Sequence, residues 1–243
     1  MKGRATSVAG IFNPTGDLPF APAEEVMISN IIQGNKLVTV NAGINPADLL
    51  QLLKENTVWH FATHHRFNWS AYRESGIELG DDRTGATKRL RLEDLFDFMP
   101  QTGPNLVVLT ICESGITDVK HYPDEVSGMS TAFLQIGASA VISARWKVSD
   151  LATTLTVAQF YLKYIGQGVS PYSALRESQL WLRDATREEL FSFLQEQQST
   201  MSMALADKMQ SLIDAVKQFP ANARPFADAK YWAAYNYQGA WAD

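Results

Sequence analysis

The chain has 243 residues, a net charge of −5 at neutral pH, 46% hydrophobic residues and 19% charged residues. This composition allows a sizeable buried core, shows no signature of disorder, and fits one large domain or one domain with an insertion. The acidic balance argues against a nucleic-acid surface, because phosphates are bound by clustered Lys and Arg. A basic peptide or a basic partner suits an acidic protein better.

The cysteine count and hydropathy indicate where such a chain functions. Cys112 is its one cysteine, so the fold needs no internal disulfide and no oxidising compartment. No run approaches 18 apolar residues, which argues against a membrane-spanning helix. The mildly apolar stretch before Asn13 is too short for the core of a signal peptide. We expect a soluble, cytoplasmic protein.

Short apolar runs rich in Val, Ile, Thr and aromatic residues recur along the chain, and each ends in polar residues or glycine. Their length and composition favour strands, and their continuous apolarity favours strands buried on both faces. In chain order they are 7–12, 36–40, 57–63, 105–112, 138–146 and 231–240.

Helical patterns stand between these runs, at 22–33, 45–56, 91–99, 124–137 and 151–166. Two of them begin with helix-start signals: Pro22 followed by two acids, and Asn45 followed by Pro46. The alternation of strand and helix predicts an α/β fold with a mostly parallel sheet covered by helices.

A helical excursion at about 170–222 interrupts the alternation and delays the last strand. Its second half, 187–219, has no Gly or Pro and has apolar residues at three- and four-residue intervals. No repeat with a period of 20–50 residues is visible. We predict a single domain over 1–243.

Three side chains with chemical potential follow predicted strands. Cys112 ends one strand, His64 follows another by one residue, and Trp146 closes a third. Ligands of open α/β sheets bind beyond the carboxyl ends of the strands, so these side chains are expected at one edge.

A cysteine beside a histidine at that edge has the chemistry of a nucleophile and its base. The thiol attacks a carbonyl only as thiolate, and an imidazole accepts its proton and returns it to the leaving amine. Backbone N–H groups of the loops after the strands supply an oxyanion site. The competing interpretation is that Cys112 is a buried core residue, as lone cysteines often are.

The other histidines are expected to have structural roles or to be solvated. His60 and His64 share one face of a strand, so a metal pair is conceivable, but no second cluster presents a third ligand. His60 is then a satisfied histidine inside its strand, and His121 is solvated in a polar loop.

Five motifs in the same order resemble the CHAT domain, a caspase-like cysteine peptidase module often attached to tetratricopeptide repeats in bacteria. His64 precedes Cys112 by 48 positions, which is similar to the caspase layout. The motifs are NPTGDLPFAPAEE (13–25), HFATHH (60–65), LVVLTICESG (106–115), the segment ending in WKVSD (128–150) and YWAAYNYQG (231–239).

The resemblance implies a caspase-hemoglobinase-like fold and a His-Cys dyad protease. It implies His64 as general base and Cys112 as nucleophile, with the backbone N–H groups of His65 and Cys112 as oxyanion donors. His65 stands where the family usually has glycine, which retains a backbone donor but adds a side chain near the substrate. No cofactor or metal is implied.

Related peptidases often bind a basic P1 side chain with carboxylates, so a substrate pocket is expected around Asp150, Trp146, Glu113 and Asp118. Asp150 also stands just before a helical pattern, where Asp is a favoured N-cap. Glu113 and Asp118 have the alternative of solvated loop acids, and Trp146 that of a core residue.

The expected function is cleavage of a protein or peptide substrate, with no nucleic-acid or membrane partner. The loop 113–128 mixes Gly, Pro and charges, so it is expected to take its working form after a partner binds, and a tetratricopeptide-type sensor is the expected partner. The alternative is a catalytically inactive peptidase-like scaffold. A small-molecule hydrolase or metal enzyme fits poorly, because no phosphate-binding glycine loop or ligand set appears.

Overall fold

The computed structural model describes residues 6–32, 36–66, 68, 70–98, 103–110 and 128–240, without the side chains of Lys36 and Tyr72. Its backbone forms two compact units. The sheet unit comprises Met1–Asp17, Asn35–Lys147 and Tyr235–Ala240, and the helical unit comprises Leu18–Gly34 and Val148–Ala234, followed by the last three residues. That the chain is one functional domain stays a prediction.

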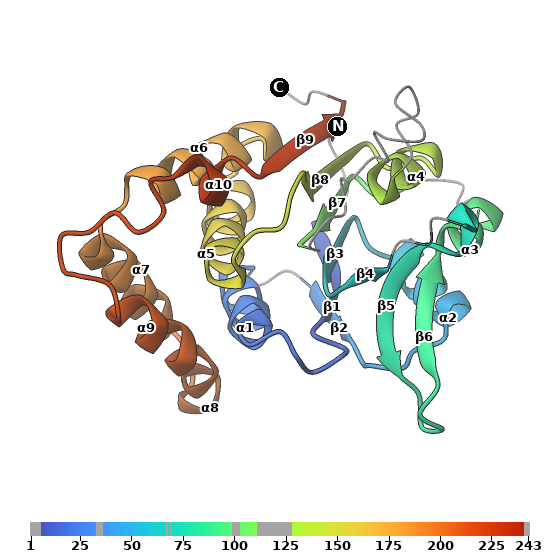
Figure 1. Cartoon of the computed structure of the whole chain (residues 1–243), viewed down its shortest axis with the longest axis horizontal. Helices are drawn as coiled ribbons and strands as arrows, with labels where there is room; N and C mark the ends of the chain where they lie inside the picture. The colour runs from blue at the N-terminus through green and yellow to red at the C-terminus, as the bar shows by residue number, and fades with distance from the viewer. Residues whose placement is uncertain are drawn as a thin grey trace. The chain divides into compact units, whose positions relative to one another are not determined.

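The sheet unit is built on a six-stranded sheet with the order β2-β1-β3-β7-β8-β9 (Figure 1). Neighbours among the first five strands are parallel, and β9 is antiparallel to β8. The bounds are β1 (Ser7–Phe12), β2 (Lys36–Val40), β3 (Val58–Ala62), β7 (Leu106–Leu109), β8 (Ala140–Ala144) and β9 (Tyr235–Gly239). The predicted mostly parallel α/β fold is therefore confirmed.

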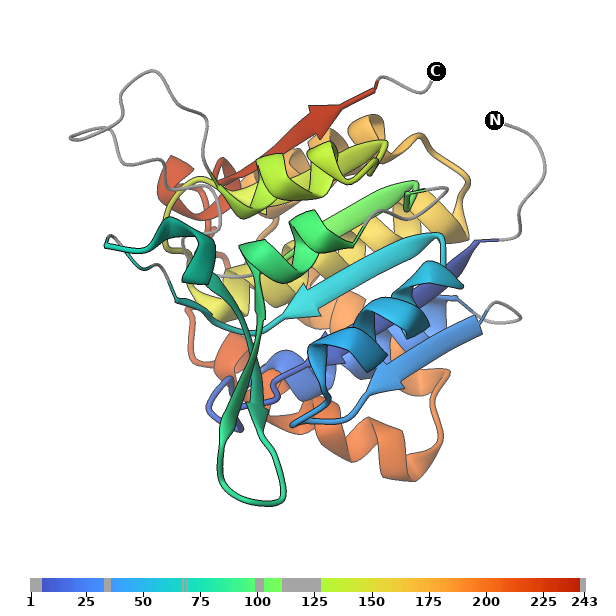
Figure 2. The same cartoon turned by 90° about the vertical axis from the view of Figure 1, so that its right-hand side faces the viewer.

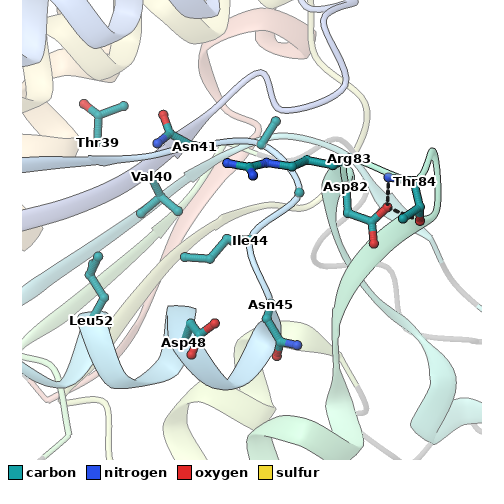
Figure 3. Close-up of a pocket in the computed structure, with 12 residues that line it drawn as sticks. Thr39, Val40, Asn41, Ile44, Asn45, Asp48, Leu52, Asp82, Arg83 and Thr84 are labelled. Carbon is teal, nitrogen blue, oxygen red and sulfur yellow. Dashed lines mark hydrogen bonds between the residues drawn. The ribbon is translucent and has the colours of Figure 1, made fainter.

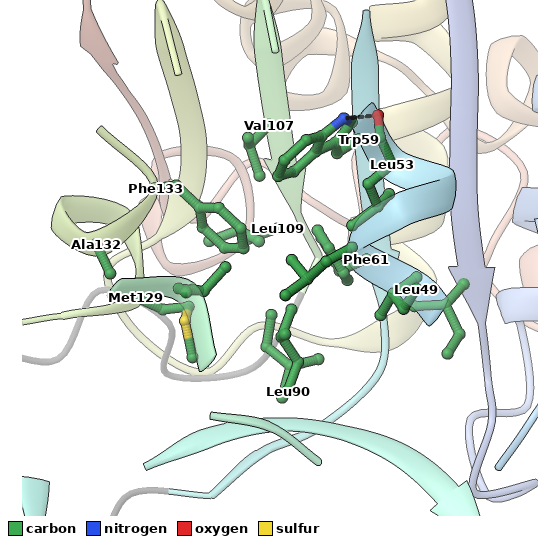
Figure 4. Close-up of a cluster of buried hydrophobic side chains, with 14 of the residues drawn as sticks. Leu49, Leu53, Trp59, Phe61, Leu90, Val107, Leu109, Met129, Ala132 and Phe133 are labelled. Atoms are coloured by element: carbon green, nitrogen blue, oxygen red, sulfur yellow. Dashed lines mark hydrogen bonds between the residues drawn. The ribbon is translucent and has the colours of Figure 1, made fainter. Parts of the chain in front are cut away.

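One face of this sheet packs against three helices of the same unit, α2 (Pro46–Lys54), α3 (Leu92–Asp97) and α4 (Met129–Gln135). Phe133 of α4 meets Trp59 and Phe61 of β3 at ring-centroid distances of 6.1 and 5.5 Å (Figure 4). Asn45 begins α2 by accepting the N–H of Ala47, as the sequence predicts. Strand side chains alternate between faces, so the odd-numbered β3 residues form this core.

A second sheet was not expected from the sequence. It contains β4 (His65–Arg66), β5 (Gly76–Asp81) and β6 (Thr87–Arg91), with a short 3₁₀ turn at Tyr72–Glu74 before β5. The antiparallel β5–β6 hairpin, drawn in teal and green in Figure 2, closes at 82–86. There the Asp82 carboxylate accepts the N–H groups of Thr84 and Ala86, which fixes the turn.

The helical unit contains the helical segment predicted before the last strand, at about 170–222. The elements of the whole unit are α1 (Ala21–Ile31), α5 (Asp150–Tyr161) with a π-helical end (Leu162–Gly166), α6 (Pro171–Asp184), α7 (Arg187–Ser199), α8 (Met203–Ala206), a 3₁₀ turn (Asp207–Met209), α9 (Gln210–Lys217) and α10 (Ala229–Trp232). Residues 187–219 are interrupted: α7 ends at Ser199, and α9 returns to pack on α7.

The predicted bounds of the last strand are partly wrong. Residues 231–240 were expected to be extended, but Asp228 caps the short helix α10 through the N–H of Lys230, and that helix runs to Trp232. The strand β9 therefore begins at Tyr235. Among the described residues, none of the helices is long and apolar enough to span a membrane.

Candidate active site at the carboxyl edge of the sheet

Three parallel strands of the sheet unit end side by side. Phe12 of β1 is in register with Ala62 of β3, and Phe61 of β3 is in register with Leu109 of β7. Backbone hydrogen bonds continue the pairing one residue further, from Asn13 N to Ala62 O at 2.7 Å and from Thr110 N to Phe61 O at 2.9 Å. The segments after β1, β3 and β7 therefore leave the sheet at one edge.

His64 lies at this edge, between β3 and β4, and its backbone is bonded to β5. The Thr63 hydroxyl donates to the carbonyl oxygen of Glu78 at 2.7 Å, and the Glu78 N–H donates to the carbonyl oxygen of His64 at 2.8 Å. Thr63 is buried, whereas the His64 side chain is 35% exposed. Hydrogen bonds to β5 therefore hold the backbone at His64, while its imidazole remains accessible to solvent.

Asp17 contacts the His64 ring from the loop after β1. Its Oδ1 lies 2.9 Å from His64 Nε2. The sequence Asn13-Pro14-Thr15-Gly16 forms a turn with a hydrogen bond from Gly16 N to Asn13 O at 3.1 Å, and Pro at the second position favours such turns. Sequence reasoning assigned no role to Asp17. The available signal was that it follows a strand that ends at the same sheet edge.

The Thr15 hydroxyl donates to Asp17 Oδ1 at 2.5 Å. This hydrogen bond, followed by the one from His64, holds the pKa of the Asp17 carboxyl below its usual value. Asp17 is therefore ionised at neutral pH, and it presents to the imidazole an oxygen that Thr15 already orients.

His65, the departure from the family pattern, lies in β4 opposite Ile77. Burial of its ring lowers the pKa of the imidazole to about 4, because desolvation disfavours the charged form. The ring is neutral at physiological pH. Since Glu78 N bonds to His64 O, His65 and Ile77 form a pair without mutual hydrogen bonds, and the His65 N–H is directed away from β5.

His60 lies inside the sheet, apart from this edge. Its ring is buried and stacks on Phe12 with centroids 5.0 Å apart. Within the part of the chain that the structure describes, no group of three or more His, Cys, Asp or Glu side chains is arranged to hold a metal ion.

Trp146 belongs to the sheet unit, and Asp150 belongs to the helical unit. Trp146 follows β8 by two residues and is partly buried. The alternative role of Asp150 as an N-cap is wrong, because Ser149 occupies the N-cap position and Asp150 is the first residue of α5. Its Oδ2 instead accepts the N–H of Phe20 at 3.1 Å. One function of this carboxylate is thus to tie the start of α5 to the start of α1.

The other predicted site residues, Cys112, Glu113 and Asp118, lie outside the described residues, as does His121. Their roles stay predictions. The described stretch 103–110 ends at Thr110, two residues before Cys112 in the sequence, and Thr110 is bonded to β3 by both its N–H and its hydroxyl.

A hollow of about 570 Å³ lies farther along the same edge, where β2 ends (Figure 3). Arg83 extends from the hairpin tip toward Asn41, above Ile44 and Asp48. Strand β2 is two strands from β3 in the sheet, which corresponds to about 10 Å. The lining is Thr39, Val40, Asn41, Ala42, Gly43, Ile44, Asn45, Asp48, Leu52, Asp82, Arg83 and Thr84.

The chain belongs to the CHAT domain family, whose model matches residues 5–240. The predicted resemblance to this family is therefore confirmed over nearly the whole sequence. The sequence matches none of the curated protein sequences with which it was compared.

Several solved structures are similar at low identity. A secreted C11 cysteine protease from Bacteroides thetaiotaomicron, solved with an irreversible peptide inhibitor, has 12% identity and a TM-score of 0.42, with 72% of this chain and 59% of that chain covered. The complex of the Porphyromonas gingivalis RgpB pro- and mature domains has 8% identity and a TM-score of 0.47, with 94% and 46% covered. A Staphylococcus aureus pyridoxal kinase has 11% identity and a TM-score of 0.34, with 72% and 86% covered. The chain spans less than two thirds of the first two proteins.

Proposed function

We propose that the protein is a cysteine endopeptidase in which His64 and Cys112 form a catalytic dyad. The observation that supports it most is the position of His64: its backbone is bonded at the carboxyl edge of the sheet, beside the strand that leads to Cys112. Cys112 is two residues after Thr110, and two extended residues span at most about 7 Å. Thr110 in turn is bonded to Phe61, three residues before His64.

The proposed reaction begins when the Cys112 thiol gives its proton to His64. The thiolate sulfur bonds to the carbonyl carbon of the substrate, whose oxygen takes the negative charge. Collapse of this intermediate breaks the C–N bond, and the leaving amine takes the proton from His64. Water, deprotonated by His64, then hydrolyses the thioester and restores the thiol.

The backbone N–H groups of His65 and Cys112 are the proposed donors to the oxyanion. The direction of the His65 N–H, away from β5, is compatible with this role. Because burial keeps the pKa of the His65 ring near 4, the ring adds no charge beside the dyad at neutral pH. The side chain that replaces the usual glycine then acts only through its bulk and polarity.

We propose that carboxylates recognise a basic P1 side chain. The candidate carboxylates are those of Asp150, Glu113 and Asp118, and Trp146 is the candidate aromatic residue for substrate contact. Asp150 has a competing structural role, since its Oδ2 accepts the N–H of Phe20. The hollow beyond β2 offers space for a further segment of an extended peptide. We also propose a cytoplasmic location and activation by a repeat-containing sensor partner.

A catalytically inactive scaffold is the second candidate, and His65 is the observation in its favour. A partly buried imidazole stands directly after the proposed base, where the family usually has no side chain. On this alternative, the edge binds a partner peptide without cutting it.

The test is a fluorogenic peptide library with every P1 residue, applied to the parent protein, Cys112→Ala and His64→Ala. The same samples are treated with iodoacetamide, and the labelling of Cys112 is compared with that of a free thiol. Cleavage that is lost in both variants establishes the dyad and the P1 preference together. Labelling no faster than the free thiol, and unchanged in His64→Ala, refutes the dyad and favours the scaffold.

A further inference from the structure

The contact between Asp17 and His64 defines which nitrogen of the imidazole is available for chemistry. His64 Nε2 lies 2.9 Å from Asp17 Oδ1. A carboxylate accepts hydrogen bonds and does not donate them, so Nε2 is the nitrogen with the hydrogen. In a neutral imidazole, the other nitrogen, Nδ1, is then the acceptor.

Neighbouring residues hold the Asp17 carboxylate in place for this contact. The Thr15 hydroxyl donates to the same Oδ1 at 2.5 Å, and both residues belong to the loop that begins with the Asn13–Gly16 turn after β1. The hairpin restrains this turn from behind: Gly80 approaches the backbone of Pro14 so closely that a Cβ at position 80 would overlap the Pro14 carbonyl group. The carboxylate is therefore oriented before any substrate arrives.

As a simple surface ion pair the contact would contribute little to stability, because the two side chains are 35% and 63% exposed. Its chemical consequence is larger, since it selects a tautomer and sets the plane of a proposed general base. Among the described residues, Asp17 is the one whose charged side chain contacts the His64 ring. Arg66 and Glu78 of the neighbouring strands are paired with each other at 2.9 Å.

We propose that Asp17 is a positioning residue for the proposed dyad: it holds the His64 ring with Nε2–H directed to its carboxylate, and so leaves Nδ1 to accept the thiol proton. This inference rests on the proposed peptidase function. When the thiol proton moves to Nδ1, His64 becomes an imidazolium with both nitrogens protonated. Asp17 stays ionised throughout and stabilises that cation, while the proton on Nε2 never leaves the ring.

The expected cost of losing Asp17 follows from its exposure. A buried aspartate that orients a catalytic histidine is worth about 10⁴ in rate, and groups that orient a functional ligand from outside are commonly worth about 10- to 100-fold. Water competes for the exposed Asp17 carboxylate, so the lower range applies. We expect Asp17→Ala to lower kcat about 10- to 100-fold with little change in KM.

The first measurement is the rate of Cys112 alkylation by iodoacetamide, which reports the thiolate directly and needs no substrate. Because Cys112 is the one cysteine of the chain, the label has a single site. The proteins compared are the parent, His64→Ala, Asp17→Ala, Asp17→Asn and Asp81→Asn. Asp81 is the matched control, since it also accepts a threonine hydroxyl, that of Thr87 at 2.7 Å, and is also exposed.

The expected order of rates is parent equal to Asp81→Asn, then Asp17→Asn, then Asp17→Ala near His64→Ala. The asparagine retains an oxygen acceptor oriented by Thr15 but lacks the charge, so partial rescue separates positioning from electrostatics. A second readout is the nitrogen NMR signature of His64, expected to show the Nε2–H tautomer in the parent and to change in Asp17→Ala. A merely structural role would leave this signature unmoved.

Two failures are distinguishable. If His64→Ala labels as fast as the parent, the dyad itself is refuted and the inference falls with it. If His64→Ala is slow while Asp17→Ala labels as fast as the parent and has an unchanged ring signature, the dyad stands and the role of Asp17 is refuted.

Discussion

The backbone N–H of Glu78 donates to the carbonyl oxygen of His64 at 2.8 Å, so the proposed base is tied to a hairpin that contributes no predicted catalytic residue. The Thr63 hydroxyl reinforces the link by donating to the Glu78 carbonyl oxygen at 2.7 Å. The residue before His64 and the carbonyl group of His64 itself are thereby both hydrogen-bonded to Glu78. The geometry of the site accordingly depends on β5 as well as on the main sheet.

Replacing Thr63 by Val tests that link. The change retains the shape and removes the buried donor to Glu78, so the free energy of unfolding is expected to fall by about 1–3 kcal/mol. Urea unfolding measures the loss. Thr87→Val is the control, because its hydroxyl bonds to the exposed Asp81, and its effect is expected within about 0.5 kcal/mol. Equal losses in the two variants would contradict the assigned importance of the Thr63 link.

Two glycines allow a matched test of the hairpin against the Asp17 turn. Gly80 and Gly85 both have φ of +77°, but a Cβ at Gly80 would overlap the Pro14 carbonyl group. A Cβ at Gly85 would have none of the described atoms beyond its two chain neighbours within 4 Å. Gly85→Ala should cost only the backbone strain, about 1–2 kcal/mol. Gly80→Ala should cost more and should also slow Cys112 alkylation, because the turn carrying Asp17 must shift. Thermal unfolding and iodoacetamide labelling measure both effects, and identical behaviour of the two variants would refute the coupling.

His65 predicts a pH dependence of stability. Its pKa is about 4 in the folded protein and about 6.5 when unfolded, so the unfolded chain binds the proton first as the pH falls. Stability from the neutral ring is therefore present above pH 6.5 and is lost between pH 6.5 and 4, by at most about 3 kcal/mol. His65→Asn should flatten the unfolding free energy over this window. An equal slope in the parent and the variant would show that His65 does not titrate as described.

Phe133 tests the core that supports β3. Its ring packs against Trp59 and Phe61, and it is fully buried (Figure 4). Phe133→Ala is expected to lower the free energy of unfolding by about 3–5 kcal/mol, and Phe133→Leu by less, because the leucine leaves a smaller cavity. Denaturant unfolding at neutral pH gives both values. A loss below 1 kcal/mol for the alanine variant would contradict the assignment of this ring to the core.

Several elements were predictable because their signals are local. The strands 7–12 and 36–40 have the predicted bounds, and Asn45 with Pro46 begins α2 as expected. The hairpin at 76–91 was missed, although the turn residues at 82–86 were a local signal for it. The strand expected from 231 begins at 235, because Asp228 starts a short helix first.

The sequence by itself determined the alternation of strand and helix, the family, and the placement of His64 just past a buried strand, since each depends on residues close together in the chain. Only the tertiary structure decided that Asp17 meets His64 and that Glu78 bonds to its backbone. The first contact requires β1 and β3 to be neighbours in the sheet, and the second requires the hairpin to fold back on β4. Strand order is set by the packing of the whole chain, and no local pattern encodes it. The position of Cys112 beside His64 is a prediction of the same long-range kind.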